Sequence, residues 1–298
     1  MDMNAAHVAR QGTPQSTADD ARVINALSVD VEDYFQVSAF QDSISRATWD
    51  SLPCRVERNV DRLLALLEKH GAHATFFTLG WVAHRYPELV RRIDAAGHEV
   101  GSHGYAHRRA TEQAPHEFYE DIVRAKKLLE DIVGQPVHGY RAPSFSISAR
   151  NLWAFDCIAR AGYRYSSSVY PVRHDHYGIP DAPRFAHRLP NGLVEVPMTT
   201  AQLGGVNLPA AGGGYFRLVP YAVSRWAIER VNKVDGRAAI FYLHPWELDP
   251  DQPRVNGAPL RSRFRHYLNL HKTEPRLALL LRDFRWDRID RAFTAVLQ

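Results

Sequence analysis

The sequence predicts an α/β fold built on a parallel sheet, and three features support this prediction. Short apolar runs alternate with amphipathic helical segments along most of the chain, and this alternation is typical of βαβ units. Glycines end several helical segments, at positions 71, 97, 134 and 162, where the left-handed conformation of a C-cap favours glycine. Polar side chains follow four of the apolar runs, as expected where the carboxyl ends of parallel strands form a functional edge.

The first half of the chain alternates regularly between the two kinds of element. Residues 23–31 form an apolar run that predicts a buried strand, and residues 55–70 gather their apolar side chains on one helical face. The same reasoning gives the elements that follow. We expect strands at 74–79 and 98–102, an extended segment at 137–141, a strand from Tyr163, and helices at 81–96, 117–133 and 149–161.

The second half is less regular. Residues 191–214 have no clear period, and we interpret the glycines at 212–214 as a loop, because they lack the strand-to-helix context of a dinucleotide-binding turn. A helix at 221–232 and a buried strand at 238–243 follow. The Arg-rich and aromatic segments 261–267 and 276–286 are expected to pack outside the sheet.

The composition is that of an ordinary globular protein. Of 298 residues, 45% are hydrophobic and 23% are charged, which excludes a collagen, a low-complexity polymer or an intrinsically disordered chain. Residues 1–21 are polar and lack a hydrophobic period, so we expect a disordered N-terminal tail. No linker divides the remainder, and residues 22–298 are expected to form a single domain with a C-terminal extension.

Composition also bears on partners. The net charge is +4, but the 37 basic residues are scattered among 33 acidic ones, whereas a nucleic-acid-binding protein needs a clustered basic face. No run approaches the roughly 20 apolar residues that cross a bilayer, and the N-terminus lacks the apolar core of a signal peptide. We therefore expect a soluble, cytoplasmic protein that does not bind nucleic acid and does not span a membrane.

Two strand ends carry candidate metal ligands. Asp30, Glu32 and Asp33 stand within four residues directly after the first apolar run, and such crowding of carboxylates is costly unless a cation or proton is shared. His103 and His107 follow a later run with the spacing H-x3-H, in a turn rich in glycine. A carboxylate from one strand end and two imidazoles from another predict a three-ligand metal site with open positions.

Two further strand ends carry candidate acid–base groups. Arg141 and His244 each leave an apolar run into a turn stiffened by proline. Either residue alone is more often structural than catalytic. Their arrival at the same edge as the metal ligands gives one candidate group per strand end, which favours an active site.

The motifs at these four strand ends resemble those of NodB-type polysaccharide deacetylases, carbohydrate esterase family four. The matching segments are 28–35, 101–107, 140–143, 165–171 and 242–245. The segments 263–267 and 283–286 resemble the tail of the branch associated with exopolysaccharide and exosortase loci. The resemblance spans about 25–286 and preserves the order of the motifs.

The resemblance implies a distorted (β/α)7 barrel that hydrolyses the N-acetyl group of an amino sugar in an exopolysaccharide or its precursor and releases acetate. It makes Asp30 the general base, Arg141 the group that orients this base, and His244 the general acid. It makes His103 and His107 ligands of a divalent metal, zinc in the first place, with cobalt, nickel or manganese as alternatives. The substrate-binding residues that it implies are Leu243, Pro143 and Tyr170.

Two departures from the family pattern leave choices open. The usual adjacent aspartates are replaced by Asp30, Glu32 and Asp33; strand alternation favours Glu32 as the third ligand, with Asp33 as the alternative if the chain turns directly after Val31. Ser166 stands where the related motif has an aspartate, so a carboxylate partner for His244 must come from elsewhere. Glu195 or Glu247 could supply it.

Other functions compete with deacetylation of a glycan. The spaced carboxylates also resemble enzymes of the same superfamily that hydrolyse small cyclic or linear amides. Two histidines and a carboxylate occur in iron oxygenases as well, but usually in β-sandwich folds rather than α/β folds. A catalytically silent glycan-binding protein would have no physical need for a base, an acid and a metal together. The sequence indicates no oligomeric state and predicts an N-acetylated glycan as the partner.

Overall fold

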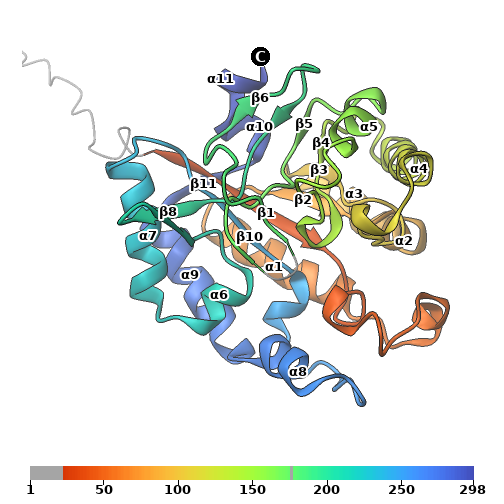
Figure 1. The fold of residues 1–298 in the computed structure, drawn as a ribbon. Helices are drawn as coiled ribbons and strands as arrows, with labels where there is room; N and C mark the ends of the chain where they lie inside the picture. Colours follow the sequence, from red (N-terminus) through yellow and green to blue (C-terminus); the bar gives the residue numbers. More distant parts are fainter. Residues whose placement is uncertain (1–22, 175–176) are drawn as a thin grey trace, which may run out of the picture.

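The computed structural model describes residues 23–174 and 177–298, and the tail predicted at 1–21 lies outside them. Seven parallel strands form a curved sheet in the order β10-β1-β2-β3-β4-β5-β7. Helices lie around the outside, with α2 to α5 to the right in Figure 1 and α7 and α9 to the left. This arrangement is the distorted (β/α)7 barrel, and the predicted fold class is confirmed.

The strands of the barrel are short, apart from the first. Their bounds are β1 (Ile24–Val31), β2 (Thr75–Thr78), β3 (Glu99–Ser102), β4 (Gly139–Tyr140), β5 (Tyr165–Ser166), β7 (Val194–Glu195) and β10 (Ile240–Leu243). A short antiparallel strand, β6 (His187–Arg188), pairs with β7. A separate hairpin consists of β8 (Thr200–Leu203) and β9 (Val206–Pro209).

The helices largely follow the predicted periodic segments. Their bounds are α1 (Val56–Lys69), α2 (Gly80–Arg85), α3 (Pro87–Ala95), α4 (Pro115–Val133), α5 (Ala154–Arg160), α6 (Gly213–Leu218), α7 (Tyr221–Lys233), α8 (Leu260–Tyr267), α9 (Thr273–Asp283), α10 (Ile289–Ala292) and α11 (Thr294–Leu297). Short 3-10 helices are η1 (Ser38–Phe40), η2 (Arg46–Ser51), η3 (Ala110–Glu112), η4 (Pro143–Phe145), η5 (Pro245–Leu248) and η6 (Leu270–Lys272). In the part of the chain that the structure describes, no helix has both the length and the apolar character to cross a membrane.

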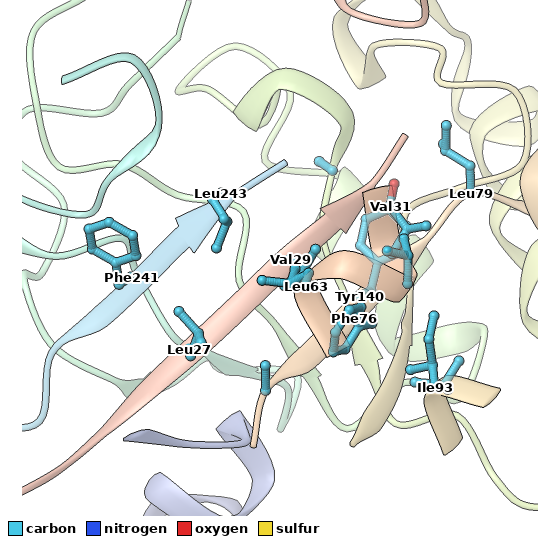
Figure 2. Packing of buried hydrophobic residues seen from close by; sticks show 14 of the residues in the cluster. Leu27, Val29, Val31, Leu63, Phe76, Leu79, Ile93, Tyr140, Phe241 and Leu243 are labelled. Atoms are coloured by element: carbon cyan, nitrogen blue, oxygen red, sulfur yellow. The ribbon is translucent and has the colours of Figure 1, made fainter. Parts of the chain in front are cut away.

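The two faces of β1 point into different surroundings, one into the outer core and the other into the barrel. Leu27, Val29 and Val31 are fully buried in the main core between strands and helices, where Figure 2 shows them near Leu63 of α1. Side chains alternate along a strand, so Asp30 projects to the opposite face, into the barrel. The apolar run that predicted the strand thus also places its one charged residue at the barrel's centre.

Residues between β7 and β10 close the barrel. The Thr199 hydroxyl accepts a hydrogen bond from the Ile240 amide at 2.6 Å, and the Ala211 carbonyl accepts one from the Tyr242 amide at 2.7 Å. Gly212 then adopts a φ of 106°, and a Cβ there would lie 2.3 Å from the Tyr242 carbonyl oxygen. The glycines at 212–214, predicted as a loop, therefore allow a close approach to β10 and begin α6.

Two other expectations were wrong in detail. The helix predicted at 81–96 is divided into α2 and α3, because Pro87 disfavours the helical conformation in the preceding residue, and Tyr86 has a φ of −131° and a ψ of 61°. The segment 276–286 does not lie wholly outside the sheet. Its end forms β11 (Arg285–Asp287), which pairs with β1 and buries Trp286.

Candidate active site

A cluster of three buried side chains forms the centre of the site. Glu32 follows β1, while His103 and His107 lie on the turn that follows β3. One ligand atom from each lies within 4.8 Å of the other two, and in the described ranges this is the group with the composition and spacing to hold a metal ion. Two imidazoles and a carboxylate are a donor set of catalytic zinc sites in hydrolases.

The protonation states of His103 and Glu32 suit metal binding. His103 Nδ1 donates to the Arg141 carbonyl at 2.8 Å, which leaves Nε2 with a lone pair. Burial lowers the pKa of His103 to about 4, so its imidazole is neutral. Burial raises the pKa of Glu32, but the charges of His107 and His244 outweigh it and lower the pKa to about 2.

One atom of this cluster lacks the contact that its burial requires. Glu32 Oε2 lies 2.8 Å from His107 Nε2, yet it accepts no hydrogen bond of acceptable geometry. An unsatisfied buried acceptor is costly, and a cation between the three side chains would satisfy it. Glu32, His103 and His107 thus fit a divalent metal.

Asp33, the alternative ligand, lies outside the cluster. Its Oδ2 accepts hydrogen bonds from the backbone amides of Arg55 at 2.5 Å and Val56 at 2.8 Å, and from Cys54 Sγ at 3.0 Å. These amides begin α1, whose N-terminus favours a negative charge. The chain turns after Glu32, so Asp33 caps a helix and does not face the histidines.

Asp30 and Arg141 form a buried ion pair beside the cluster. Arg141 Nη1 lies 2.7 Å from Asp30 Oδ1, and the guanidinium is fully buried. Its remaining donors bind the Ser28 hydroxyl at 2.9 Å and the Ser167 carbonyl and hydroxyl at 3.0 and 2.9 Å. Asp30 Oδ2 faces His244 Nε2 at 3.9 Å. The pair therefore presents one oxygen of Asp30 to the centre of the site.

Glu247 is the carboxylate that contacts His244. Its Oε1 lies 2.8 Å from His244 Nδ1 and also accepts the His244 backbone amide at 3.0 Å, while Oε2 accepts from Arg217 Nε at 2.6 Å. Burial alone would raise the pKa of Glu247, but Arg217 and His244 lower it to about 2. Glu195, the other carboxylate considered, accepts the amides of Ser168 and Val169.

His244 is surrounded by carboxylates. Burial lowers its pKa, but Glu32, Glu247 and Asp30 outweigh burial and raise the pKa to about 9. Its ring stacks on Trp246 at a centroid distance of 5.1 Å. At neutral pH the imidazole is therefore protonated, as a proton donor needs to be.

A cavity of about 210 Å³ opens onto these groups, with Asp30, Glu32, both histidines of the turn and His244 among its lining residues. Its aromatic walls are Phe145, Tyr177, Tyr242 and Trp246. Ser144 and Phe145, in the loop after Arg141, have positive φ angles of 55° and 50°. Such strained positions concentrate at functional sites.

The residues predicted to bind substrate lie elsewhere. Leu243, Pro143 and Tyr170 are buried but do not line this cavity. Strand alternation turns Leu243 toward the outer core with Phe241, as Figure 2 shows, and brings Tyr242 inward. Tyr170 stacks against Tyr177 at 5.9 Å, behind the cavity wall.

Sequence reasoning missed several residues from the C-terminal part of the chain. Arg217 and His266 line the cavity, and His266 stacks on Trp246 at 4.1 Å. Glu247, one of the two carboxylates that the sequence offered as a partner for His244, also follows it at the spacing of a capping box. No local pattern marks Arg217, which is 30 residues from its partner Glu247.

Comparisons with known proteins divide the chain into two matched parts. Residues 41–166 match the family described as "Polysaccharide deacetylase", and residues 167–294 match one described as "Domain of unknown function (DUF3473)". A peptidoglycan deacetylase of Helicobacter pylori is 30% identical over 43% of this chain and 41% of its own length. A chitooligosaccharide deacetylase of Azorhizobium caulinodans is 38% identical over 26% of this chain and 38% of its own.

The chain thus covers less than half of the length of these curated relatives. Among solved structures, a protein described as a polysaccharide deacetylase from Mycobacterium smegmatis has the same fold, with a TM-score of 0.60 over 96% of this chain and 93% of that one, at 20% identity. Residues 41–166 therefore belong to the polysaccharide deacetylase family, and residues 167–294 form a DUF3473 region.

Proposed function

We propose that the protein is a metal-dependent N-deacetylase that hydrolyses the N-acetyl group of an amino sugar in a glycan and releases acetate. One observation carries this proposal. A candidate metal cluster, a carboxylate held by an arginine and a histidine held by a carboxylate all line the same cavity. Amide hydrolysis needs these three components, an electrophile, a base and an acid.

Glu32, His103 and His107 would hold the metal, for which we propose zinc. A bound divalent ion would polarise the amide carbonyl and make water more acidic. Asp30 Oδ2 takes the proton from the attacking water, since Arg141 occupies the other oxygen and fixes the orientation of the carboxylate. Water adds to the carbonyl carbon, and the tetrahedral intermediate then breaks at its C–N bond.

His244 completes the reaction. An amide nitrogen is a poor leaving group until it is protonated, and Nε2 of His244 faces the carboxylates of Asp30 and Glu32 at 3.9 and 3.6 Å. Glu247 holds the opposite nitrogen, so the proton that is transferred is the one on Nε2. The amine leaves, and acetate remains.

For the substrate we propose an N-acetylated exopolysaccharide or its precursor. The relatives named above act on peptidoglycan and on chitooligosaccharide, according to their descriptions, which supports an N-acetylated amino sugar. The aromatic rings of Phe145, Tyr177 and Tyr242 beside the catalytic groups suit the acetyl methyl and the apolar face of a pyranose. The segments 263–267 and 283–286 support the exopolysaccharide branch.

The test is acetate release from N-acetylated chitooligosaccharides by zinc-loaded protein. We expect turnover that stops with a chelator, returns with zinc and falls by at least about 10²-fold in Asp30→Asn, because Asn cannot accept the proton. The matched control is Asp50→Asn, which changes an exposed carboxylate that forms an ion pair with Arg85. This variant should retain full activity. Turnover that persists in the chelated protein, or in Asp30→Asn, would contradict the proposal.

A further inference from the structure

The hairpin of β8 and β9 has one apolar face. Leu203 pairs with Val206 and Ala201 pairs with Leu208, and because side chains alternate along each strand, these four side chains lie on the same face. Polar side chains pair on the opposite face. Residues 196–216, which include the hairpin, contain no Asp, Glu, Lys, Arg or His. The hairpin is thus amphipathic and carries no charged side chain.

The rest of the protein covers this apolar face only in part. Its base packs on α7, beside which β8 lies in Figure 1, through a small cluster of Ala201, Ala210 and Ala227. Nearer the turn, Leu203 and Val206 are 55% and 61% exposed. Exposed apolar side chains that adjoin one another are typical of an interaction surface, because their burial is favourable.

Helix α7 continues the apolar surface. Val223 is one helical turn before Ala227 on the same side of the helix, and Trp226 is three residues after Val223. Val223 and Trp226 are 44% and 41% exposed. Arg230 Nε donates to the Gln202 carbonyl at 2.6 Å, which attaches the hairpin to the helix. We define the hairpin patch as the exposed side chains of Leu203, Val206, Leu208, Val223 and Trp226.

Basic side chains border the hairpin patch. Helix α7 carries Arg225, Arg230 and Lys233 but only one acidic residue, Glu229, which is shared between Arg225 and Lys233. The helix therefore keeps a positive charge, and 74% of the Lys233 side chain is exposed. A second copy of the chain, placed on the patch by twofold symmetry, would bring these cations against their own copies. The charges favour a partner that is anionic.

The tip of the hairpin suits a lipid surface. Gly204 and Gly205 have positive φ angles of 57° and 80°, as a two-residue hairpin turn requires, and they place no polar side chain between Leu203 and Val206. Tryptophan is enriched at membrane interfaces, and Lys and Arg near the surface attract anionic lipids. Apolar side chains, an adjoining tryptophan and bordering cations together are typical of a peripheral membrane contact.

We propose that the hairpin patch docks the protein on the surface of an anionic lipid bilayer. Leu203 and Val206 enter the headgroup region, and Lys233 faces the anionic headgroups. The attachment is peripheral, because single side chains and a two-residue turn enter the lipid. This inference goes beyond the proposed function and does not depend on which glycan the enzyme processes.

Cosedimentation of the full chain with lipid vesicles tests the proposal. One set of vesicles is phosphatidylcholine alone, and the other also contains about 30% phosphatidylglycerol. We expect the wild-type protein to bind the anionic set more tightly, and to bind it less tightly as salt screens the charges. Leu203→Asp should lower the partition coefficient by at least about tenfold, because it places a charge at the inserted tip. Lys233→Glu should lower it by about fivefold on the anionic set only.

The matched control is Leu152→Asp. Leu152 is 51% exposed and directly precedes α5, which lies on the other side of the barrel from α7 in Figure 1. This variant should bind vesicles as the wild-type protein does, and all three variants should keep the wild-type thermal midpoint. The proposal is overturned if the wild-type protein binds neither set or binds both equally, or if Leu203→Asp and Leu152→Asp bind alike.

Sedimentation velocity without lipid identifies the alternative occupant, a second copy of the chain. We expect the same sedimentation coefficient for the wild-type protein and Leu203→Asp, because the patch contacts lipid. A dimer that Leu203→Asp dissociates, in a protein that binds no vesicles, would assign the hairpin patch to a second copy and overturn the proposal.

Discussion

The candidate catalytic side chains of this protein occur in pairs, in which one residue fixes the orientation of the other. Arg141 binds one oxygen of Asp30, and Glu247 binds one nitrogen of His244. In both pairs the other polar atom, Oδ2 of Asp30 or Nε2 of His244, remains directed at the cavity. The C-terminal region supplies Arg217, which holds Glu247 in turn and donates to three backbone carbonyls near the end of α8.

Glu247 is predicted to act as a positioning residue. Glu247→Gln should lower kcat by about 10- to 100-fold with little change in KM, because the amide cannot both orient His244 and stabilise its positive charge. Steady-state kinetics on an N-acetylated oligomer measures this split. The matched control is Glu229→Gln on α7, whose ion pairs are partly exposed. A variant with wild-type kcat, or one changed only in KM, would argue against orientation of His244 by Glu247.

Glu99 is predicted to make stability depend on pH. Burial and the neighbouring Asp290 raise the pKa of Glu99 from 4.5 to about 7, while its oxygens accept hydrogen bonds from Thr75 and Tyr165. The folded state thus binds this proton more tightly than the unfolded state. The stabilisation is full below pH 4.5 and is lost as the pH rises through 7, by up to about 3 kcal/mol.

Thermal unfolding at several pH values tests this prediction. The wild-type midpoint should fall between about pH 5 and pH 8, and Glu99→Gln should show a flatter profile, since a neutral amide mimics the protonated carboxyl. Glu68→Gln, at an exposed position of α1, should keep the wild-type slope. The explanation fails if Glu99→Gln retains that slope too.

Among the elements, α1 depends on a side chain far from it in sequence. The Asp33 carboxylate accepts hydrogen bonds from the first backbone amides of this helix. The side chain of Arg55, the N-cap residue of the helix, makes no capping hydrogen bond. A carboxylate at this position satisfies donors that the helix cannot pair internally. Glu32 and Asp33 are adjacent, yet one belongs to the candidate metal cluster and the other to a helix.

This division gives opposite expectations for the two carboxylates. Asp33→Ala should destabilise the fold by about 2 kcal/mol and keep bound zinc, because it removes a buried cap. Glu32→Ala should lose zinc, because it removes a candidate ligand and leaves two histidines. Denaturant unfolding and zinc content by mass spectrometry measure both. Loss of zinc from Asp33→Ala, together with its retention by folded Glu32→Ala, would reverse the assignment.

At the scale of the molecule, the two matched regions share one barrel. β1 lies between β2 and β10, so its partners come from both regions, and Arg141 reaches Ser167 and Met198 across the boundary between them. We propose that residues 22–298 are a single folding unit. The DUF3473 region would then be the second part of the barrel and the source of His244.

Separation of the two regions tests this proposal. Residues 1–166 produced alone should show no cooperative thermal transition, because β1 would expose the edge that β10 covers and Arg141 would lose its buried acceptors. Calorimetry of the fragment beside the full chain measures this. A fragment that unfolds cooperatively and binds zinc through Glu32, His103 and His107 would show two independent domains.

Local patterns predicted most of the elements because apolar spacing depends on nearby residues. They placed β1 and the helix at 55–70 within about a residue of their ends, and they failed where distant contacts decide. Trp286 lies in a strand because the segment around it pairs with β1. The glycines at 212–214 begin a helix because β10 lies against them.

For this protein, the sequence by itself determined the class of fold and which chemical groups stand at strand ends, since both follow from alternation along the chain. Only the tertiary structure decided that Glu32 rather than Asp33 joins the histidines, and that Glu247 with Arg217 holds His244. These contacts join residues up to 75 positions apart, such as Glu32 and His107, and closure of the barrel determines which side chains meet.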